Sequence, residues 1–362
     1  MVPAWRIKVV TLFTLLIAVA APAAADSAIP IQWNGFALLR PQTSGDAPLP
    51  AESLSAQIQL GVDWRPFAGF GTHLHLLARN EGDESRRSHV GVVEAYAEKN
   101  LSVRTGNVRI LAGAFFLPTS RENVDSLWET PYTLTPSALN TWLGEELRPI
   151  GADVSYRHRL LRGTITGGAT AFAGNDTFGE LLIGRGWALD DRWSLLGEHL
   201  ESRPAHYTSV SAENDHRIGW SARAKWNDDA GAIQFTRIDN RSDALRYGEL
   251  FGWATRFNIV GGDYAWRDWT AAAEAGWGST AIVTARGRFS SDIGAAYVLV
   301  SRLVDKKFRV TLRADEYEVA NDRQHAWTAA VLWEALPHLR AGIEGIRAED
   351  ETRAAIELRY RF

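Results

Sequence analysis

The sequence predicts an all-β protein, a transmembrane antiparallel β-barrel of 16 strands, with 18 as the alternative count. Three observations predict it. Residues 353–362 alternate between apolar and mostly charged side chains and end on Phe362, as a strand between two different solvents does. Alternating segments of about ten residues recur along the chain, and short and long connections separate them in turn. The N-terminus carries an export signal.

Residues 1–25 are predicted to be a signal peptide. Arg6 and Lys8 precede an apolar run over 9–21, and three alanines, 23–25, precede Asp26. A basic stretch, a short apolar stretch and small residues at a cleavage site define such a peptide. Residues 26–362 are then expected to form one barrel domain. They contain no apolar run near the ~20 residues of a membrane helix, and the other structure that spans a bilayer is a closed barrel.

The alternation divides the remaining chain into sixteen segments. We predict strands at about 31–40, 53–65, 72–80, 89–98, 103–113, 148–159, 163–173, 216–226, 231–239, 249–263, 268–277, 292–303, 308–317, 325–334, 339–346 and 353–362. Two long inserts interrupt them, at 114–147 and 174–215. Segments 278–291 and 181–200 are ambiguous, and each could contribute a further strand, which gives the alternative of 18.

One face of these strands is apolar and the other is polar and rich in arginine. We expect the apolar face to contact lipid and the polar face to line a wet lumen, where arginine and lysine favour anions. The alternative is that these arginines pair with lumen acids and only stiffen the wall. The predicted pore-lining residues are Arg65, Arg79, Arg109, Arg157, Arg159, Arg217, Arg223, Lys225, Arg256, Arg309, Arg313, Asp63 and Asp153.

The insert 114–147 is the third outer loop by this division, and it is too long and too apolar for an ordinary surface loop. Trp128, Tyr132, Leu134 and Trp142 need burial. We therefore predict that the loop folds inward and narrows the lumen; the alternatives are an outer cap or a trimer contact. The charged residues expected to line or brace this constriction are Arg121, Glu122, Asp125, Glu129, Glu145, Glu146 and Arg148.

Composition limits the remaining possibilities. The chain has 15 tryptophans, and many lie near predicted strand ends, which favours girdles at the membrane interfaces over ordinary core aromatics. The net charge of −4 argues against nucleic acid as a partner. The chain has no cysteine, and His73 and His75 are interpreted as lining residues without further ligands. We expect no metal and no cofactor.

Several segments resemble the phosphate-selective porins of proteobacteria and related families. They are the run 115–118 (Phe-Phe-Leu-Pro), Thr-Ser-Arg-Glu-Asn at 119–123, Pro-Tyr-Thr at 131–133, Gly-Glu-Glu at 144–146 and the aromatic last residue. The resemblance implies a 16-strand barrel, a homotrimer and an inward third loop. It does not extend to a phosphate site, because those channels use lysines in this loop and 114–147 contains none.

Together these features predict a porin in the outer membrane of a Gram-negative bacterium. It would form a water-filled channel for passive diffusion of small hydrophilic solutes, with a mild preference for anions. Its expected partners are the lipid bilayer, lipopolysaccharide, those solutes and two further copies of itself. The alternatives are a plugged barrel with a structural or interaction role and, less favoured, an outer-membrane hydrolase; we expect no enzymatic activity.

Overall fold

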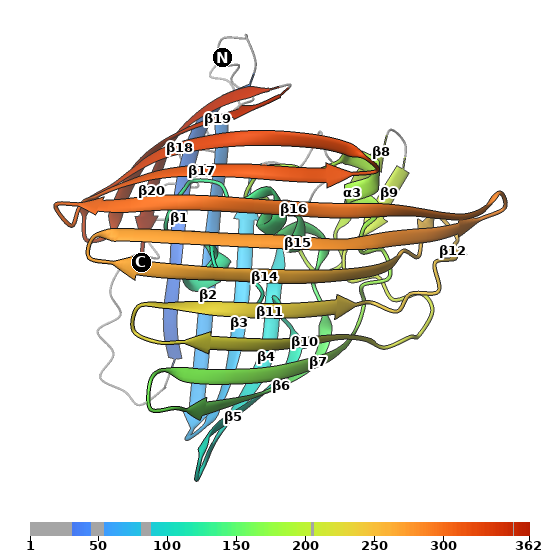
Figure 1. Cartoon of the computed structure of the whole chain (residues 1–362), viewed down its shortest axis with the longest axis horizontal. Helices are drawn as coiled ribbons and strands as arrows, with labels where there is room; N and C mark the ends of the chain where they lie inside the picture. Colours follow the sequence, from blue (N-terminus) through green and yellow to red (C-terminus); the bar gives the residue numbers. More distant parts are fainter. Residues whose placement is uncertain (1–30, 45–53, 81–87, 204–205, 350) are drawn as a thin grey trace, which may run out of the picture.

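The computed structural model describes residues 31–44, 54–80, 88–203, 206–349 and 351–362, so the predicted signal peptide lies outside the described residues. Sixteen antiparallel strands close into a barrel (Figure 1), which confirms the predicted fold; the count of 18 is wrong. The strands are β1 (Ile31–Ser44), β2 (Leu54–Phe67), β3 (Phe70–Arg79), β4 (Val90–Val103), β5 (Gly106–Ala114), β6 (Ile150–Arg159), β7 (Thr164–Ala173), β10 (Gly219–Asn227), β11 (Gly231–Asp239), β14 (Ala254–Trp266), β15 (Trp269–Thr284), β16 (Gly287–Val304), β17 (Phe308–Val319), β18 (Asp322–Leu336), β19 (Leu339–Ala348) and β20 (Thr352–Arg361).

The two ends of the chain close the barrel against each other. β1 pairs with β20, with Phe36 opposite Arg361 and Leu39 opposite Leu358. Gly35 and Phe362 exchange two backbone hydrogen bonds, of 3.1 and 3.0 Å. Closure leaves no strand edge with unpaired backbone groups, which a membrane-spanning sheet requires.

The connections give the barrel two different ends. Seven connections of two to four residues lie at one end, next to the start of β1 and the end of β20; we call this the short-turn end. The long connections lie at the opposite end. Segment 278–291, left ambiguous by the sequence, forms the end of β15 and the start of β16, which with 16 and 18 residues are the longest strands. No helix among the described residues is long and apolar enough to cross a membrane.

The outward face is apolar, as the alternation predicts. Ile356, Leu358 and Tyr360 of β20 are exposed, whereas Glu357 and Arg359 between them are buried inside. Nine tryptophans of the described residues are exposed. Trp64, Trp226, Trp266, Trp269 and Trp333 lie near the short turns and Trp220, Trp277 and Trp327 lie toward the other end, an arrangement that suits two interfacial girdles.

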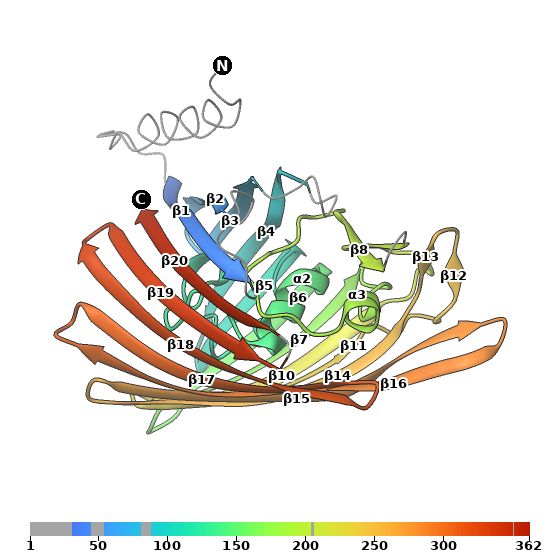
Figure 2. The ribbon, with the colours of Figure 1, turned by 90° about the horizontal axis from the view of Figure 1, so that it is seen from above.

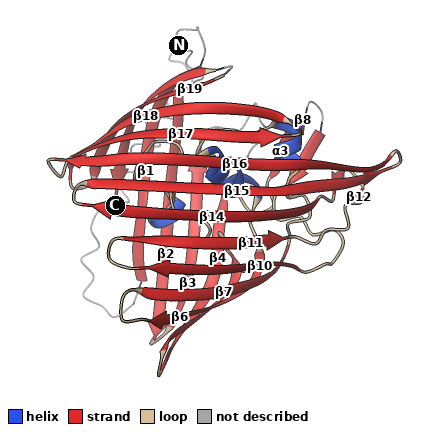
Figure 3. Ribbon diagram, viewed as in Figure 1, coloured by secondary structure: helices blue, strands red, loops and turns tan. Residues whose placement is uncertain are grey.

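Both long inserts fold into the barrel (Figure 2). The first insert, residues 115–149, contains η2 (Ser126–Trp128) and α2 (Ala138–Glu146). The second insert, residues 174–218, contains α3 (Glu180–Arg185) and the small sheet of β8 (His199–Arg203) and β9 (His206–Ser209). The ambiguous segment 181–200 therefore holds a helix and the start of β8 rather than a barrel strand. Figure 3 shows these helices as the blue elements within the red barrel. A second small sheet, β12 (Arg246–Tyr247) with β13 (Leu250–Phe251), lies in connection 240–253.

Candidate functional site: the lumen and its two inserts

The first insert reaches the wall on all sides of the lumen. Phe116 clusters with Leu77 and Val93 of β3 and β4. Farther along, Leu127 clusters with Phe36 and Leu38 of β1. Tyr132 clusters with residues of β15 and β16, and Leu134 clusters with residues of β18 and β20. The insert therefore crosses the lumen instead of following one wall, which agrees with the predicted inward fold.

Glycines of the wall provide room for these side chains. A Cβ atom added at Gly61 of β2 would lie 2.9 Å from the Leu127 side chain. The same atom at Gly276 of β15 would lie 3.0 Å from Leu139, and at Gly342 of β19 it would lie 2.6 Å from Leu134. Since real Cβ contacts are longer, any larger residue at these three glycine positions would displace the insert. The missing side chains let the insert pack directly on the sheet.

A buried arginine holds the first insert to β17. Arg313 is 1% exposed and lies 2.8 Å from a Glu122 carboxylate oxygen of the insert and 2.7 Å from Asp315. It also donates to the carbonyl oxygens of Thr135, at 2.7 Å, and Pro136, at 3.1 Å. Such charge-assisted bonds are the strong ones in a dry interior, so this cluster fixes the middle of the insert.

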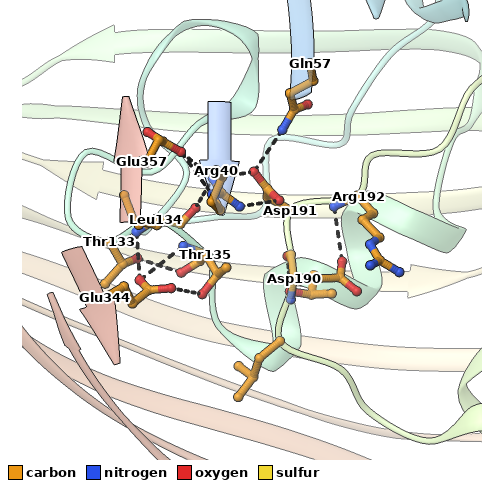
Figure 4. Close-up of polar contacts among 12 residues, drawn as sticks. Arg40, Gln57, Thr133, Leu134, Thr135, Asp190, Asp191, Arg192, Glu344 and Glu357 are labelled. Carbon is orange, nitrogen blue, oxygen red and sulfur yellow. Dashed lines mark hydrogen bonds and ion pairs between the residues drawn. The ribbon is translucent and has the colours of Figure 1, made fainter. Parts of the chain in front are cut away.

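A second polar cluster joins both inserts to β1, β19 and β20 (Figure 4). Arg40 of β1 lies 2.7 Å from Asp191 of the second insert, and its Nε donates to Glu357 of β20 at 3.1 Å. Arg40 also donates to the Leu134 carbonyl at 3.1 Å. Glu344 of β19 accepts from the Leu134 and Thr135 amides at 2.7 and 3.2 Å. The ion pairs thus position loop backbone and do not face open water.

The two inserts share an apolar core inside the lumen. Trp142 of α2 stacks on Phe178 of the second insert at 4.5 Å and meets Phe257 of β14 edge-on at 4.9 Å. Trp193 of the second insert packs edge-on against Phe116 and Trp128 of the first. This core runs from β5 and β7 on one side of the barrel to β14, β16, β17, β18 and β19 on the other.

The inserts fill the lumen at their own level. Every barrel strand has an inward side chain that is 0–8% exposed. One from each strand, in order around the barrel, is Leu38, Gln59, His75, Glu94, Leu111, Asp153, Thr170, Ser221, Thr236, Phe257, Glu274, Tyr297, Arg313, Thr328, Glu344 and Glu357. The inserts and neighbouring wall side chains cover these positions.

Two charged groups of the first insert lie in apolar surroundings. Burial raises the pKa of Glu146 to about 7, although its carboxylate accepts from the Gly179 and Leu181 amides at 3.2 and 2.5 Å and from the Trp142 indole. Burial lowers the pKa of Arg148 to about 9; its guanidinium lies 3.4 Å from the centre of the Phe116 ring and donates to the Gly144 carbonyl at 2.9 Å. The Glu146 carboxylate joins the first insert to the second, and the Arg148 guanidinium binds a carbonyl within the first insert.

The raised pKa of Glu146 predicts that the inserts are less stable at high pH. The folded carboxyl holds its proton up to about pH 7, while the unfolded one releases it near 4.5. Stability should therefore fall as pH rises from about 4.5 to 7 and level off above, by at most about 3 kcal/mol. Glu146→Gln should remove this slope, as measured by denaturant unfolding in detergent between pH 5 and 8. Glu201→Gln, which changes an exposed residue of β8, is the control and should show the same slope as wild type. An unchanged slope in Glu146→Gln would contradict the assignment of the pH dependence to Glu146.

Beneath the first insert lies a cavity of about 920 Å³ that extends toward the short-turn end. Five cationic residues line it, and Glu94 and Asp263 are its two acids. The cations are Arg109, Arg121, Arg157, Arg223 and Lys225. Phe116, Trp128 and Tyr132 of the insert contribute an aromatic part of its lining. The wall of this cavity carries a surplus of positive charge.

Most predicted pore-lining residues lie on the inner face, but few meet open space. Arg223 binds Asp153 through two bonds of 2.6 and 2.7 Å, Arg79 pairs with Glu198, and Arg109 pairs with Glu98 at 2.8 Å. Asp63 lies 3.0 Å from His73. Arg309 lies over the Tyr132 ring, and Arg65 and Arg159 are exposed at the short-turn end. The alternative reading, that lumen arginines pair with acids, holds for these pairs, whereas Arg157 and Lys225 have no ion-pair partner among the described residues.

Two predicted pore-lining residues are misplaced. Arg256 points outward from β14 and pairs with Asp239 at 3.2 Å, because Phe257 and Ile259 occupy the inward positions against the inserts. Arg217 precedes β10 and is exposed, with its side chain 4.0 Å from Asp215. Neither lines the lumen.

All but one of the residues predicted for the constriction loop contact the barrel wall or the second insert. Glu129 pairs with Arg359, Glu145 pairs with Arg185 of α3, and Arg121 lies 3.4 Å from Asp263. Asp125 is exposed. The sequence analysis missed the inward fold of the second insert and the wall partners Arg40, Glu344 and Glu357. The tryptophans of the second insert, Trp187 and Trp193, were the available signal.

Comparisons with known proteins support the fold. No protein-family model matches the chain, and no curated protein matches its sequence. Among solved structures, OmpT of Vibrio cholerae in its trimer form is 10% identical with a TM-score of 0.58, over 93% of this chain and all of that one. OmpF of Salmonella typhi, in complex with daunomycin, is 12% identical with a TM-score of 0.58, over 92% and 97%.

The anion-selective porin from Comamonas acidovorans is 13% identical with a TM-score of 0.54, over 92% of this chain and 99% of that one. At these identities the likeness shows the fold, a multi-pass barrel of the outer-membrane porin type. A specific likeness to the phosphate-selective porins is not among these findings.

Proposed function

We propose that this protein is an outer-membrane porin that lets small hydrophilic solutes diffuse, with a mild preference for anions and without enzymatic activity. The observation that carries the proposal is the cavity beneath the first insert, whose wall holds five cationic residues and two acids. A low-dielectric wall focuses the field of such charges into the cavity, and rings of arginine and lysine favour anions. The likeness to an anion-selective porin is in keeping with this.

The inserts occupy much of the lumen and pack against its wall. This packing favours the second candidate function, a plugged barrel with a structural or interaction role. The two candidates differ in one observable. A porin opens in a bilayer, at least intermittently, while a permanent plug stays silent.

The selectivity prediction is tested with the purified full chain in a planar bilayer under a tenfold KCl gradient. We expect discrete conductance steps with a reversal potential shifted from zero toward the equilibrium potential of chloride, because the cavity attracts anions. A reversal potential shifted toward the equilibrium potential of potassium would contradict the anion preference. Continuous silence from folded, inserted protein would favour the plugged barrel.

We also propose a homotrimer in contact with lipid and lipopolysaccharide, by analogy with the trimer form of the Vibrio cholerae protein. Light scattering in detergent, corrected for bound detergent, should give three copies of the chain. A single copy under several mild detergents would contradict the trimer without affecting the channel proposal.

A further inference from the structure

We infer that the cavity beneath the first insert is a binding site for a small organic anion, with its carboxylate between Arg157 and Lys225 and its apolar body against the aromatic lining of the insert. The inference rests on the proposed anion preference and names the class of solute. The volume of about 920 Å³ suits a small-molecule site.

The sheet register places the two cations as a pair. Arg157 of β6 and Lys225 of β10 lie directly opposite Thr166 on the two sides of β7. Neighbouring strands are about 4.8 Å apart, so the two backbones are separated by about 10 Å. Both side chains are long enough to reach one ion above Thr166. The hydroxyl of Thr166 offers a further donor at the midpoint, and all three residues line the cavity.

The charge of this pair is not cancelled by its neighbours. Arg223 and Arg109 in the adjacent row have their own carboxylates, Asp153 and Glu98. Arg157 and Lys225 have no ion-pair partner among the described residues. Arg121 adds to the positive field at Lys225, while Asp263, which lies 3.4 Å from Arg121, reduces it. Two neighbouring cations without an ion-paired acid favour an anion between them.

The opposite part of the lining is apolar and partly uncovered. Phe116 is buried between Arg148 and Trp128, on which it stacks at 4.3 Å, so the aromatic surface open to the cavity is that of Trp128. Val124 lines the cavity with 49% of its surface exposed. An inorganic ion would leave this surface wet, whereas a solute with an aromatic or alkyl body would cover it. The combination identifies an amphipathic carboxylate rather than a free inorganic anion.

The test uses the detergent-purified full chain and isothermal titration with benzoate, benzamide, acetate and inorganic phosphate. We expect benzoate to bind, because it carries both the charge and the ring, and the three other probes to bind at least about tenfold more weakly. Arg157→Gln with Lys225→Gln should weaken benzoate binding by about tenfold or more. The matched control, Arg162→Gln with Lys307→Gln, removes two charges from exposed short turns and should leave binding unchanged.

Val124→Asn tests the apolar half; it should weaken benzoate but not acetate. Heat-dependent migration on gels confirms that each variant is folded. Equal binding of benzoate and benzamide, phosphate binding without benzoate binding, or a cavity double variant that behaves like its control would each overturn the inference. If benzoate binding depends on Arg157 and Lys225 but the protein is silent in bilayers, the binding site is supported and the porin function is refuted. If the protein conducts anions selectively but does not bind benzoate, the porin function is supported and the binding site is refuted.

Discussion

Replacing Arg313 with methionine is expected to lower the free energy of unfolding by about 3–5 kcal/mol, because it leaves the buried carboxylates of Glu122 and Asp315 without the cation that neutralises them. Both carboxylates are almost fully buried and bind Arg313 at 2.8 and 2.7 Å. Denaturant unfolding in detergent, followed by tryptophan fluorescence, measures the loss. Hydrogen exchange over residues 115–149 should rise, since the Thr135 and Pro136 carbonyls also lose their donor.

The matched control for Arg313→Met adds Glu122→Gln and Asp315→Asn. This triple variant has no unpaired charge, so it should recover most of the lost stability while the contacts to the two carbonyls stay missing. A triple variant as unstable as the single one would show that the carboxylates are not what Arg313 neutralises.

Removing the second insert is expected to open the barrel. Asp176 and Ala212 are neighbours, with the Asp176 amide 3.0 Å from the Ala212 carbonyl, so residues 177–211 can be replaced by two glycines. The change removes Phe178, Leu182 and Leu189 from the core that crosses the lumen, and Trp193 from its contact with Phe116. Single-channel conductance should rise at least about tenfold over wild type, because water replaces a dry core.

The control for this excision removes residues 246–251, the exposed tip of a neighbouring connection whose ends are closed by a Gly252–Leu245 hydrogen bond of 2.7 Å. It shortens the same end of the barrel without touching the lumen core, so conductance should stay at the wild-type level. If the excision of 177–211 leaves a folded but silent barrel, the first insert alone closes the lumen.

The strands were predictable because a wall between lipid and lumen imposes a two-residue period. Segment 53–65 alternates along its length, and the structure turns Gln57 and Gln59 inward and Ile58 and Leu60 outward. The rule failed at β14, where Phe257 and Ile259 point inward and Arg256 outward. There the inner face meets an apolar insert instead of water, while the outer face carries Arg256 and Asn258, so the local alternation assigns the two faces the wrong way round.

The interior of the lumen was less predictable than its wall. The apolar residues of the first insert predicted its inward fold, but the ion pairs that hold it to the wall involve residues far away in the sequence. Arg313 meets Glu122 across 191 positions, and Arg40 meets Glu357 across 317. Such pairs follow from how the strands close into a cylinder, which no local pattern encodes. The cavity pair of Arg157 and Lys225 was assigned to the correct face, but its proximity needs the register of β6, β7 and β10.

The three wall glycines that contact the first insert also bear on the order in which the molecule is assembled. Gly61, Gly276 and Gly342 belong to β2, β15 and β19, and they receive leucine side chains from one segment, residues 127–139. That segment is synthesised after Gly61 and well before Gly276 and Gly342. Docking must therefore be a late event, completed only once the C-terminal hairpins have joined the N-terminal strand, and the apolar stretch stays in need of protection until then.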